Sequence, residues 1–359
     1  MRATSNSRRP NPDCIAATGV PPVPPEDSPQ ADVQVGRGAT PRGGSRRDLR
    51  QDVTDRIIAM LEKGGNVFRE RWTRAASRGM PRNGKTGAPY HGANVLLLWD
   101  AAIEHGYASN VWLTYKQAAS LGGQVRKGEK AVLCAHFERR ASRQEASSES
   151  DGAAAEREEA ASEPRRSGCV LLCLAFWVFN IAQIDGLPSG LVEAALAPKE
   201  WADRSPIEGA MRFLGGCRAD VRHGFERAAY ALQADRILMP DVERFTSPEA
   251  YCATALHELV HWTGHPDRLG RAFGQRFGDA AYAFEELVAE LGSAFVLGEI
   301  GLLDATIEGH AGYLEAWLRV LRNDRTAIFT AARHAGEACH YILARALPPL
   351  DDRPGPRLD

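Results

Sequence analysis

The sequence predicts an α+β protein of two domains, an N-terminal domain of mixed helices and strands and a mainly helical C-terminal domain. Three observations support this prediction. The 359 residues exceed the usual size of one domain, and the hydrophobic share of 44% is enough to form buried cores. Helix-like and strand-like hydrophobic patterns alternate in the first half of the chain, whereas long helix-like patterns dominate the second half.

Both ends of the chain and one internal stretch lack the pattern of a folded segment. Residues 1–47 hold eight prolines among Gly, Ser and Arg, and residues 348–359 form a short polar end. The stretch 139–167 consists mostly of Ala, Ser, Glu and Arg. Such compositions cannot bury a core, so we expect two disordered tails and a disordered insertion in a hairpin loop.

The N-terminal domain is expected over residues 48–188. Apolar residues recur at helical spacing near its start, and Thr114 is a suitable N-cap for a later, shorter helix. Two apolar runs on either side of the insertion are typical of buried strands. We therefore expect helices at about 48–65, 94–105 and 115–121, and strands at about 130–138 and 169–179.

The boundary between the domains is predicted at 187–198, which contains two prolines and a glycine. The C-terminal domain follows over 198–347, and Ser247-Pro248-Glu249 is a typical helix start, with a cap, a first-turn proline and an acid. The expected helices lie at about 206–214, 248–264, 280–298, 305–322 and 324–346, and two short strands at 219–223 and 228–232.

The formal net charge of −2, taken alone, argues against a nucleic-acid-binding protein. The average conceals two opposite segments, however. Residues 48–137 contain 13 Lys and Arg against 8 Asp and Glu, a net of +5, whereas residues 185–310 contain 11 against 20, a net of −9. A basic N-terminal domain is therefore joined to an acidic C-terminal domain, and nucleic acid is not excluded as a partner of the first.

The cysteines and the apolar runs predict a soluble protein of the cytoplasm. The seven cysteines are odd in number and form no CxxC pair, which is typical of free thiols in a reducing compartment. No apolar segment of a signal peptide follows the first residues. The longest apolar run, 170–179, is shorter than the roughly 20 residues that span a bilayer, so no membrane partner is expected.

The strongest local signal is the segment 257–261, HELVH. On a helix, His257 and His261 share one face and can bind the same cation. Glu258 on the same turn can then act as the general base that takes a proton from water as the water attacks a carbonyl. The pattern predicts a zinc-dependent metallopeptidase site with Zn²⁺ as its cofactor.

A catalytic zinc site needs a third protein ligand, and the sequence offers two. Asp267 stands at the spacing of a metzincin-like third ligand, whereas Glu286 lies on the next predicted helix. We favour Glu286, because an acid four residues later, Glu290, is placed to orient a ligand histidine. On this interpretation Glu285 would point to the wrong face.

The basic N-terminal domain has two glycine-containing turns with cations. The first, 81–87, includes Arg82 and Lys85, and the second, 125–130, includes Arg126, Lys127 and Lys130. Aromatic residues are interleaved with the basic ones, as in grooves that hold single-stranded nucleic acid by charge and stacking. The aromatic candidates are Trp72, Tyr90, Trp99, Tyr107, Trp112 and Tyr115. The same composition also fits a solvated face over core aromatics.

Several separated motifs resemble the ArdC-type antirestriction proteins. They are the pattern N-x-x-T-G-x-x-Y-x-G-x-N over 83–94, WLT at 112–114, VRKGEK at 125–130, the segment 179–188, HELVHWTGH at 257–265 and EELVAE at 285–290. The resemblance covers roughly residues 50–345. It implies a single-stranded DNA-binding N-terminal domain, a zincin-like metallopeptidase C-terminal domain and a role in protecting mobile-element or plasmid DNA from restriction.

The combined prediction is an antirestriction-type protein that binds single-stranded DNA and carries a zinc peptidase domain, with a peptide or protein as a further partner. The resemblance adds Asn83, Thr86 and Asn94 to Tyr90, Trp112 and the five cations as DNA-contacting residues. Two alternatives stay open. One is a non-catalytic module that protects DNA and has a structural zinc site, and the other is a DNA-tethered peptidase that cleaves a host or phage protein.

Overall fold

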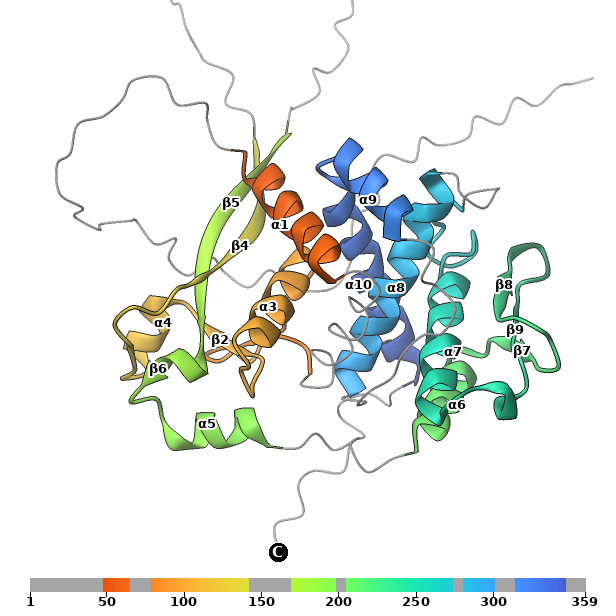
Figure 1. Cartoon of the computed structure of the whole chain (residues 1–359), viewed down its shortest axis with the longest axis horizontal. Helices are drawn as coiled ribbons and strands as arrows, with labels where there is room; N and C mark the ends of the chain where they lie inside the picture. The colour runs from red at the N-terminus through yellow and green to blue at the C-terminus, as the bar shows by residue number, and fades with distance from the viewer. Residues whose placement is uncertain are drawn as a thin grey trace, which may run out of the picture. The chain divides into compact units, whose positions relative to one another are not determined.

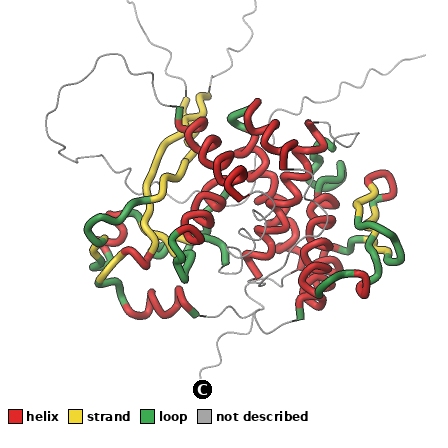
Figure 2. Tube along the Cα trace, in the orientation of Figure 1, coloured by secondary structure: helices red, strands yellow, loops and turns green. Residues whose placement is uncertain are grey.

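A computed structural model describes residues 48–64, 79–141, 169–197, 205–273, 280–300 and 314–346. These residues form the predicted α+β architecture, with mixed helices and strands in the first half and mainly helices in the second (Figures 1 and 2). Both predicted tails, Trp72 and most of the predicted insertion lie outside the described residues. Among the described helices there is none whose length and apolarity would suffice for a membrane span.

The first half is built around a long antiparallel hairpin. Strand β4 (Val132–Ala141) pairs along its whole length with β5 (Cys169–Asn180), and β5 continues the sheet through β2 (Val111–Leu113) to the short β1 (Arg82–Asn83). The hairpin is the one predicted, but β4 extends three residues into the stretch assigned to the insertion. Register matching explains this extension, since Ala141 still pairs with Cys169.

Three helices and a second small sheet complete this half. Helices α1 (Leu49–Gly64), α3 (Ala93–Glu104) and α4 (Tyr115–Ser120) agree with prediction to within two residues. Thr114 caps α4 through a capping box, in which its hydroxyl accepts from the backbone of Gln117 and the Gln117 side chain accepts from the backbone of Thr114. Strands β3 (Gln124–Val125) and β6 (Ile184–Asp185) form a separate antiparallel pair.

The predicted boundary segment 187–198 contains a helix, α5 (Ser189–Leu196). Pro188 precedes its first residue, a position where proline is compatible with a helix because no intrahelical bond is lost there. The proline therefore marks a helix start rather than irregular chain. Leu187 and Leu191 pack against a small second core that includes Val111, Leu113 and Ile184.

The second half begins with α6 (Pro206–Cys217) and a three-stranded sheet in the order β7, β9, β8. Strands β7 (Asp220–Arg222) and β8 (Ala229–Ala231) were predicted, whereas the central strand β9 (Arg236–Leu238) was missed. Three residues are too few to show an alternating pattern. The ion pair between Arg236 and Asp220, with Nε and Oδ2 2.9 Å apart, joins β9 to β7.

Four helices follow in the order predicted: α7 (Pro248–Thr263), α8 (Ala280–Ile300), α9 (Leu314–Asn323) and α10 (Ala327–Ala346). Helices α7 and α8 are buried on almost every side, and α10 packs against both. Figure 1 shows α10 and α8 lying side by side, with α7 beyond them toward the small sheet.

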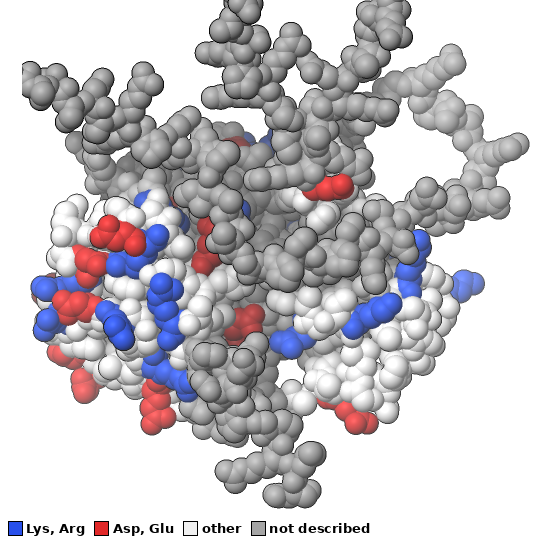
Figure 3. Space-filling view, turned by 180° about the vertical axis from the view of Figure 1, so that it is seen from behind, with Lys and Arg blue, Asp and Glu red and all other residues white. Residues whose placement is uncertain are grey.

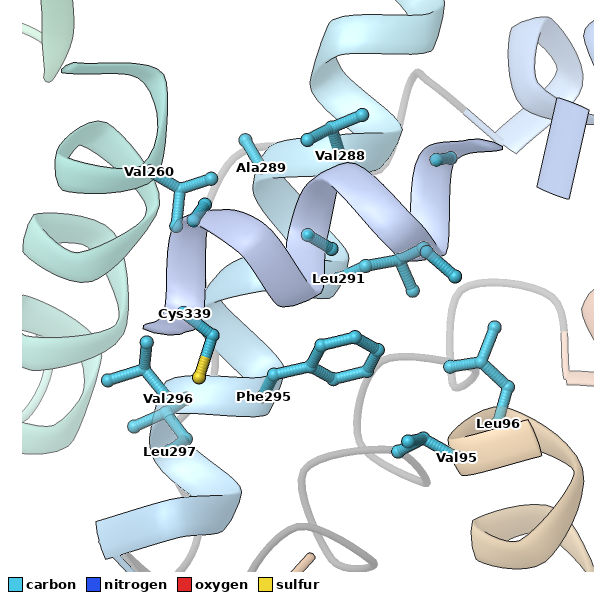
Figure 4. Packing of buried hydrophobic residues seen from close by; sticks show 14 of the residues in the cluster. Val95, Leu96, Val260, Val288, Ala289, Leu291, Phe295, Val296, Leu297 and Cys339 are labelled. Atoms are coloured by element: carbon cyan, nitrogen blue, oxygen red, sulfur yellow. The ribbon is translucent and has the colours of Figure 1, made fainter. Parts of the chain in front are cut away.

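One continuous hydrophobic core joins the two halves. The described residues all belong to one compact unit, and its main buried cluster contains side chains from α1 and α3 as well as from α6 to α10. The rings of Trp99 in α3 and Phe295 in α8 are 5.8 Å apart in an edge-on arrangement. Figure 4 shows Phe295 directed from α8 toward the side where Val95 and Leu96 of α3 lie. The halves therefore bury apolar surface against each other.

Helices α7 and α8 approach closely because Gly292 has no side chain. A Cβ atom at this position would lie 2.8 Å from Cγ1 of Val260 and 2.9 Å from its Cγ2. Real Cβ atoms essentially never come so near another carbon, so any larger residue forces the helices apart. Gly292 lies on the same helix as the acidic residues that face α7, so this close approach fixes how near they come to it.

We therefore expect Gly292→Ala to destabilise the protein by about 1–3 kcal/mol, because it overpacks the α7–α8 contact. Gly336→Ala is the matched control, since this glycine also lies inside a helix but an added Cβ would meet nothing within 4 Å. Its helix propensity should instead raise stability by up to about 1 kcal/mol. Urea unfolding of the two variants tests the pair, and equal effects would contradict the packing argument.

Candidate metal centre

Helix α7 begins and ends as its sequence predicts. The Ser247 hydroxyl accepts a hydrogen bond from the backbone of Ala250 at 3.1 Å, and Pro248 fills the first helical position. The helix ends at Gly264. The helix places His257 and His261 one turn apart, and both residues are at most 8% exposed. Residues that usually face water are thus held within the protein.

Three donor groups converge between α7 and α8. The Nε2 atoms of His257 and His261 are 3.2 Å apart, and the Glu286 carboxylate lies 3.5 Å from the first and 3.6 Å from the second. Ligand atoms bound to zinc at about 2.0–2.1 Å in a tetrahedron are separated by about 3.3 Å. The observed spacing therefore fits one small divalent cation, and among the described residues this is the one cluster with such geometry.

The structure distinguishes between the two candidates for the third ligand. Glu286 faces both histidines and is 5% exposed, whereas the Asp267 side chain is 88% exposed. The Asp267 carboxylate instead lies 3.6 Å from Nδ1 of His265, and its backbone N–H donates to the same nitrogen. Asp267 therefore belongs to a surface turn.

Each of the two histidines has a second carboxylate on its far side. Oε2 of Glu290 lies 3.7 Å from Nδ1 of His257, as the four-residue spacing suggested. Oε1 of Glu285 lies 3.2 Å from Nδ1 of His261, so the expectation that Glu285 points away is wrong. Consecutive residues of α8 are about 100° apart around its axis, and α7 packs closely enough to receive both.

Arg271 is a site residue that the sequence did not reveal. It follows α7 in a loop, is 8% exposed, and its guanidinium donates to both carboxylate oxygens of Glu285. No spacing motif connects an arginine in a loop to a metal site. The sequence did contain one signal for its partner Glu285. Two adjacent acids, 285 and 286, accompany two histidines, so each acid could have been assigned to a histidine.

Burial and neighbouring charges shift the pKa values of Glu258, Glu285 and His261 in opposite directions. Burial raises the pKa of Glu258, and the two histidines only partly oppose this. Burial alone would lower the pKa of His261, but the hydrogen bond with Glu285 and the nearby carboxylates raise it overall. For Glu285, His261 and Arg271 outweigh burial and lower the pKa. For Glu258, unlike Glu285, burial therefore disfavours the charged carboxylate in the metal-free site.

The predicted DNA-contacting residues divide into exposed and structural ones. Arg82, Lys85, Thr86, Lys127 and Lys130 have exposed side chains. Arg126 is exposed too, but its guanidinium bonds Glu129, Asp185 and the carbonyl of Ala182, and therefore joins a loop to β6.

Trp112 is fully buried, so its indole cannot stack on a base in this fold. Its ring packs edge-on against Tyr107. The Asn94 side chain also has a structural partner. It donates to the carbonyl of Ala135 and accepts from the N–H of the same residue, both at 2.8 Å. These two predicted contacts are corrected to structural roles.

Asn83 and Tyr90 also maintain the fold. The side-chain Oδ1 of Asn83 accepts from the backbone N–H groups of Lys85 and Thr86 and so shapes the glycine-containing turn. Tyr90 is half-buried and stacks on Phe176, with ring centroids 6.4 Å apart. Asn83 thus shapes the turn that carries the cations, and Tyr90 packs against β5.

Two aromatic side chains of the first half are well exposed. Tyr115, one of the predicted candidates, is 52% exposed, and Trp177, which was not predicted, is 56% exposed. Trp177 lies on β5 opposite Leu133, and α4, which begins with Tyr115, packs against β5. Position 177 lies inside a uniformly apolar run, and only the alternation of the strand shows that it faces outward.

Comparison with known proteins gives consistent matches over most of the chain. Residues 47–171 match the N-terminal domain of anti-restriction factor ArdC, and residues 208–334 match a zincin-like metallopeptidase family. The protein y4eC of Sinorhizobium fredii is 37% identical over 83% of this chain and 92% of its own length. A DNA primase TraC of Escherichia coli is 35% identical over 83% of this chain, which spans only 27% of the primase.

Two crystal structures of the antirestriction protein ArdC from plasmid R388 are also similar. The metal-free form has a TM-score of 0.65 at 36% identity and is matched over 84% of this chain and 98% of its own. The Mn(II)-bound form has a TM-score of 0.63 at the same identity and is covered over 99% of its length.

The buried Glu258 predicts how metal-free protein responds to pH. Because its pKa is raised in the folded state, ionisation costs more there than in the unfolded chain, whose glutamates titrate near about 4.3. The contribution of Glu258 to stability is therefore fully present below that value and is lost as the pH rises through its folded pKa. Glu258→Gln removes this loss, so the Tm of the variant should rise relative to the wild-type Tm as the pH increases above about 4.3.

Thermal unfolding in the presence of a chelator measures this difference. Glu243→Gln is the control, because this acid is exposed and its replacement should leave the pH profile unchanged. A constant difference between Glu258→Gln and wild type across the range would contradict the assigned pKa direction.

Proposed function

Because this chain belongs to the family of ArdC-type antirestriction proteins, we propose that it protects the DNA of a mobile element, with a single-stranded DNA-binding first half and a metal-dependent peptidase second half. The observation that carries the proposal is the convergence of His257, His261 and Glu286 on one point beside Glu258. Antirestriction is the expected biological outcome of the two activities together.

The metal of the second half is proposed to be zinc, held by His257, His261 and Glu286. Two imidazoles and one carboxylate leave a fourth position for water or substrate, as in catalytic rather than structural zinc sites. The R388 relative was crystallised with Mn(II), and a nitrogen- and oxygen-donor set of this kind accepts several divalent metals. Glu290 and Glu285 would orient the two imidazoles through their Nδ1 atoms.

A divalent cation in this position polarises a carbonyl group and acidifies water. Glu258 is the proposed general base, because it is buried beside both histidines and is not one of the three converging ligands. It takes a proton from water as the water attacks the peptide carbonyl, and it returns that proton to the departing amine.

The first half is proposed to bind single-stranded DNA through exposed cations and exposed aromatic rings. Arg82, Lys85, Lys127 and Lys130 supply charge for phosphates, and Tyr115 and Trp177 supply faces for stacking. Figure 3 shows the molecule from behind, so the first half lies on the right, and the Lys and Arg side chains on that side stand mostly apart from Asp and Glu and are separated by uncharged surface. A local patch rather than a uniformly basic domain is therefore the proposed interface.

Two alternatives to this function have distinct consequences. In one, the metal only stabilises the fold, and the protein protects DNA without cleaving anything. In the other, DNA serves as a tether and the peptidase acts on a host or phage protein. The similarity to the primase supports a DNA-related context, but primase activity is not carried over, because this chain spans about a quarter of that protein.

Metal analysis combined with an antirestriction assay tests the peptidase half. Wild-type protein should bind about one divalent ion per chain. His257→Ala should lose the ion, while Glu258→Gln should retain it and lose peptide hydrolysis and antirestriction together. Full antirestriction by metal-loaded Glu258→Gln would favour the non-catalytic alternative, and full metal retention by His257→Ala would refute the site.

Titration of single-stranded DNA at several salt concentrations tests the other half. Charge reversal at Arg82 and Lys85 should reduce the slope of log affinity against log salt by about 0.7 for each phosphate that is no longer neutralised. Trp177→Ala should cost about 1–3 kcal/mol per stacked base and leave the slope unchanged. Phe225→Ala, which removes an exposed aromatic ring of the second half, is the control and should change neither quantity.

A further inference from the structure

Arg271 is the buried arginine of the candidate metal centre, and nothing in the general zincin pattern requires it. We propose that Arg271 and Glu285 form a positioning pair that fixes the His261 imidazole for metal binding. This inference rests on the proposed metal site and adds the loop after α7 to the residues that determine its affinity. The hydrogen bonds of the guanidinium, the charge of the site and the space beside Gly264 support it.

All three nitrogens of the Arg271 guanidinium donate hydrogen bonds. Its Nε lies 3.2 and 3.1 Å from the two oxygens of Glu285, and its Nη2 lies 2.8 Å from Oε1 of the same carboxylate. Nη1 donates to the Thr263 hydroxyl at 2.9 Å, and Nη2 also donates to the carbonyl of Val260 at 2.6 Å. Both last acceptors belong to the final turn of α7, so the guanidinium joins the end of one helix to the start of the next.

Glu285 in turn determines which way the His261 ring is protonated. Its Oε1 faces Nδ1 of His261 at 3.2 Å, while Nε2 of the same ring faces Glu286. A carboxylate at Nδ1 holds the proton there and leaves the Nε2 lone pair for a cation. Because Arg271 binds both oxygens, Glu285 cannot rotate away without breaking several hydrogen bonds.

Arg271 also compensates part of the negative charge of the site. Glu258, Glu285, Glu286 and Glu290 are all buried, and Arg271 is the only arginine or lysine among the described residues that is buried with them. A carboxylate that lies 2.8 Å from a guanidinium is neutralised locally and serves His261 as a hydrogen-bond acceptor. Glu286 then remains the acid that faces both Nε2 atoms.

Gly264 shows that the chain leaves room for this guanidinium. Its backbone has φ −78° and ψ −5°, a conformation that any residue adopts, so glycine is not needed there for backbone reasons. A Cβ atom would lie 2.8 Å from Nη2 of Arg271 and 2.8 Å from the ring of Phe273. The absence of a side chain at 264 therefore allows the guanidinium to reach Glu285.

The test compares two arginines of the same loop. Arg271→Lys keeps the charge but loses the planar donor group, so metal affinity should fall about 10-fold, the lower end of the usual effect of such outer partners. Arg268→Lys is the matched control. Arg268 also forms an ion pair with Asp235 and stacks on Trp262 at 3.8 Å. It donates hydrogen bonds to Asp235, the carbonyl of Trp262 and the Tyr230 hydroxyl, and none of these partners is a metal-facing histidine.

Affinity is measured by competition between the folded protein and a chromophoric chelator for Zn²⁺, with Co²⁺ absorption as a second readout of ligand geometry. We expect Arg271→Lys to weaken binding and alter the Co²⁺ spectrum, and Arg268→Lys to lower Tm without either change. Gly264→Ala, which displaces the guanidinium without removing it, should weaken binding in the same direction and keeps the test available if Arg271→Lys does not fold.

Three outcomes are decisive. Unchanged affinity and an unchanged Co²⁺ spectrum in both Arg271→Lys and Gly264→Ala would overturn the positioning role while leaving the metal site intact. Equal loss of affinity in Arg268→Lys would also overturn it, because the effect would then be general destabilisation. Failure of wild-type protein to bind either metal would instead refute the proposed function on which this inference rests.

Discussion

The contact between α7 and α8 is the constraint on which the site depends. Val260 fits against Gly292 with no room for another carbon, and this closeness brings the acids of α8 to the imidazoles of α7. Burying charged and polar groups is costly unless each finds a partner. Here each ring nitrogen of His257 and His261 has a carboxylate oxygen within 3.7 Å, and this proximity offsets part of the cost of burying the polar cluster inside a hydrophobic core.

Much of this arrangement could be predicted from the sequence because it is local. The helix with His257, Glu258 and His261 carries its own start and end signals, and the order of the helices follows from hydrophobic spacing. The pairing of the long hairpin follows from two apolar runs on either side of a polar stretch. The family resemblance was likewise confirmed, because it depended on several motifs in a fixed order.

What sequence reasoning missed depends on which way a side chain points in three dimensions. Trp112 and Trp177 both lie in apolar strands, yet one is fully buried and the other 56% exposed, and only the register of β5 between its neighbours decides this. Arg271 and Glu285 lie on a loop and on the following helix, and they meet through the packing of α7 against α8. Strand β9 is too short to leave a pattern, although it is central to its sheet.

The shared core has a consequence for how such proteins are inherited. Trp99 of the first half packs on Phe295 of the second, so separating the halves would expose large apolar faces on both. A fragment that contained either half alone would expose these faces, whereas the joined pair keeps them buried and can form part of a larger chain. The match to a quarter of a much longer primase covers 83% of this chain, as expected of a cassette that is transferred whole.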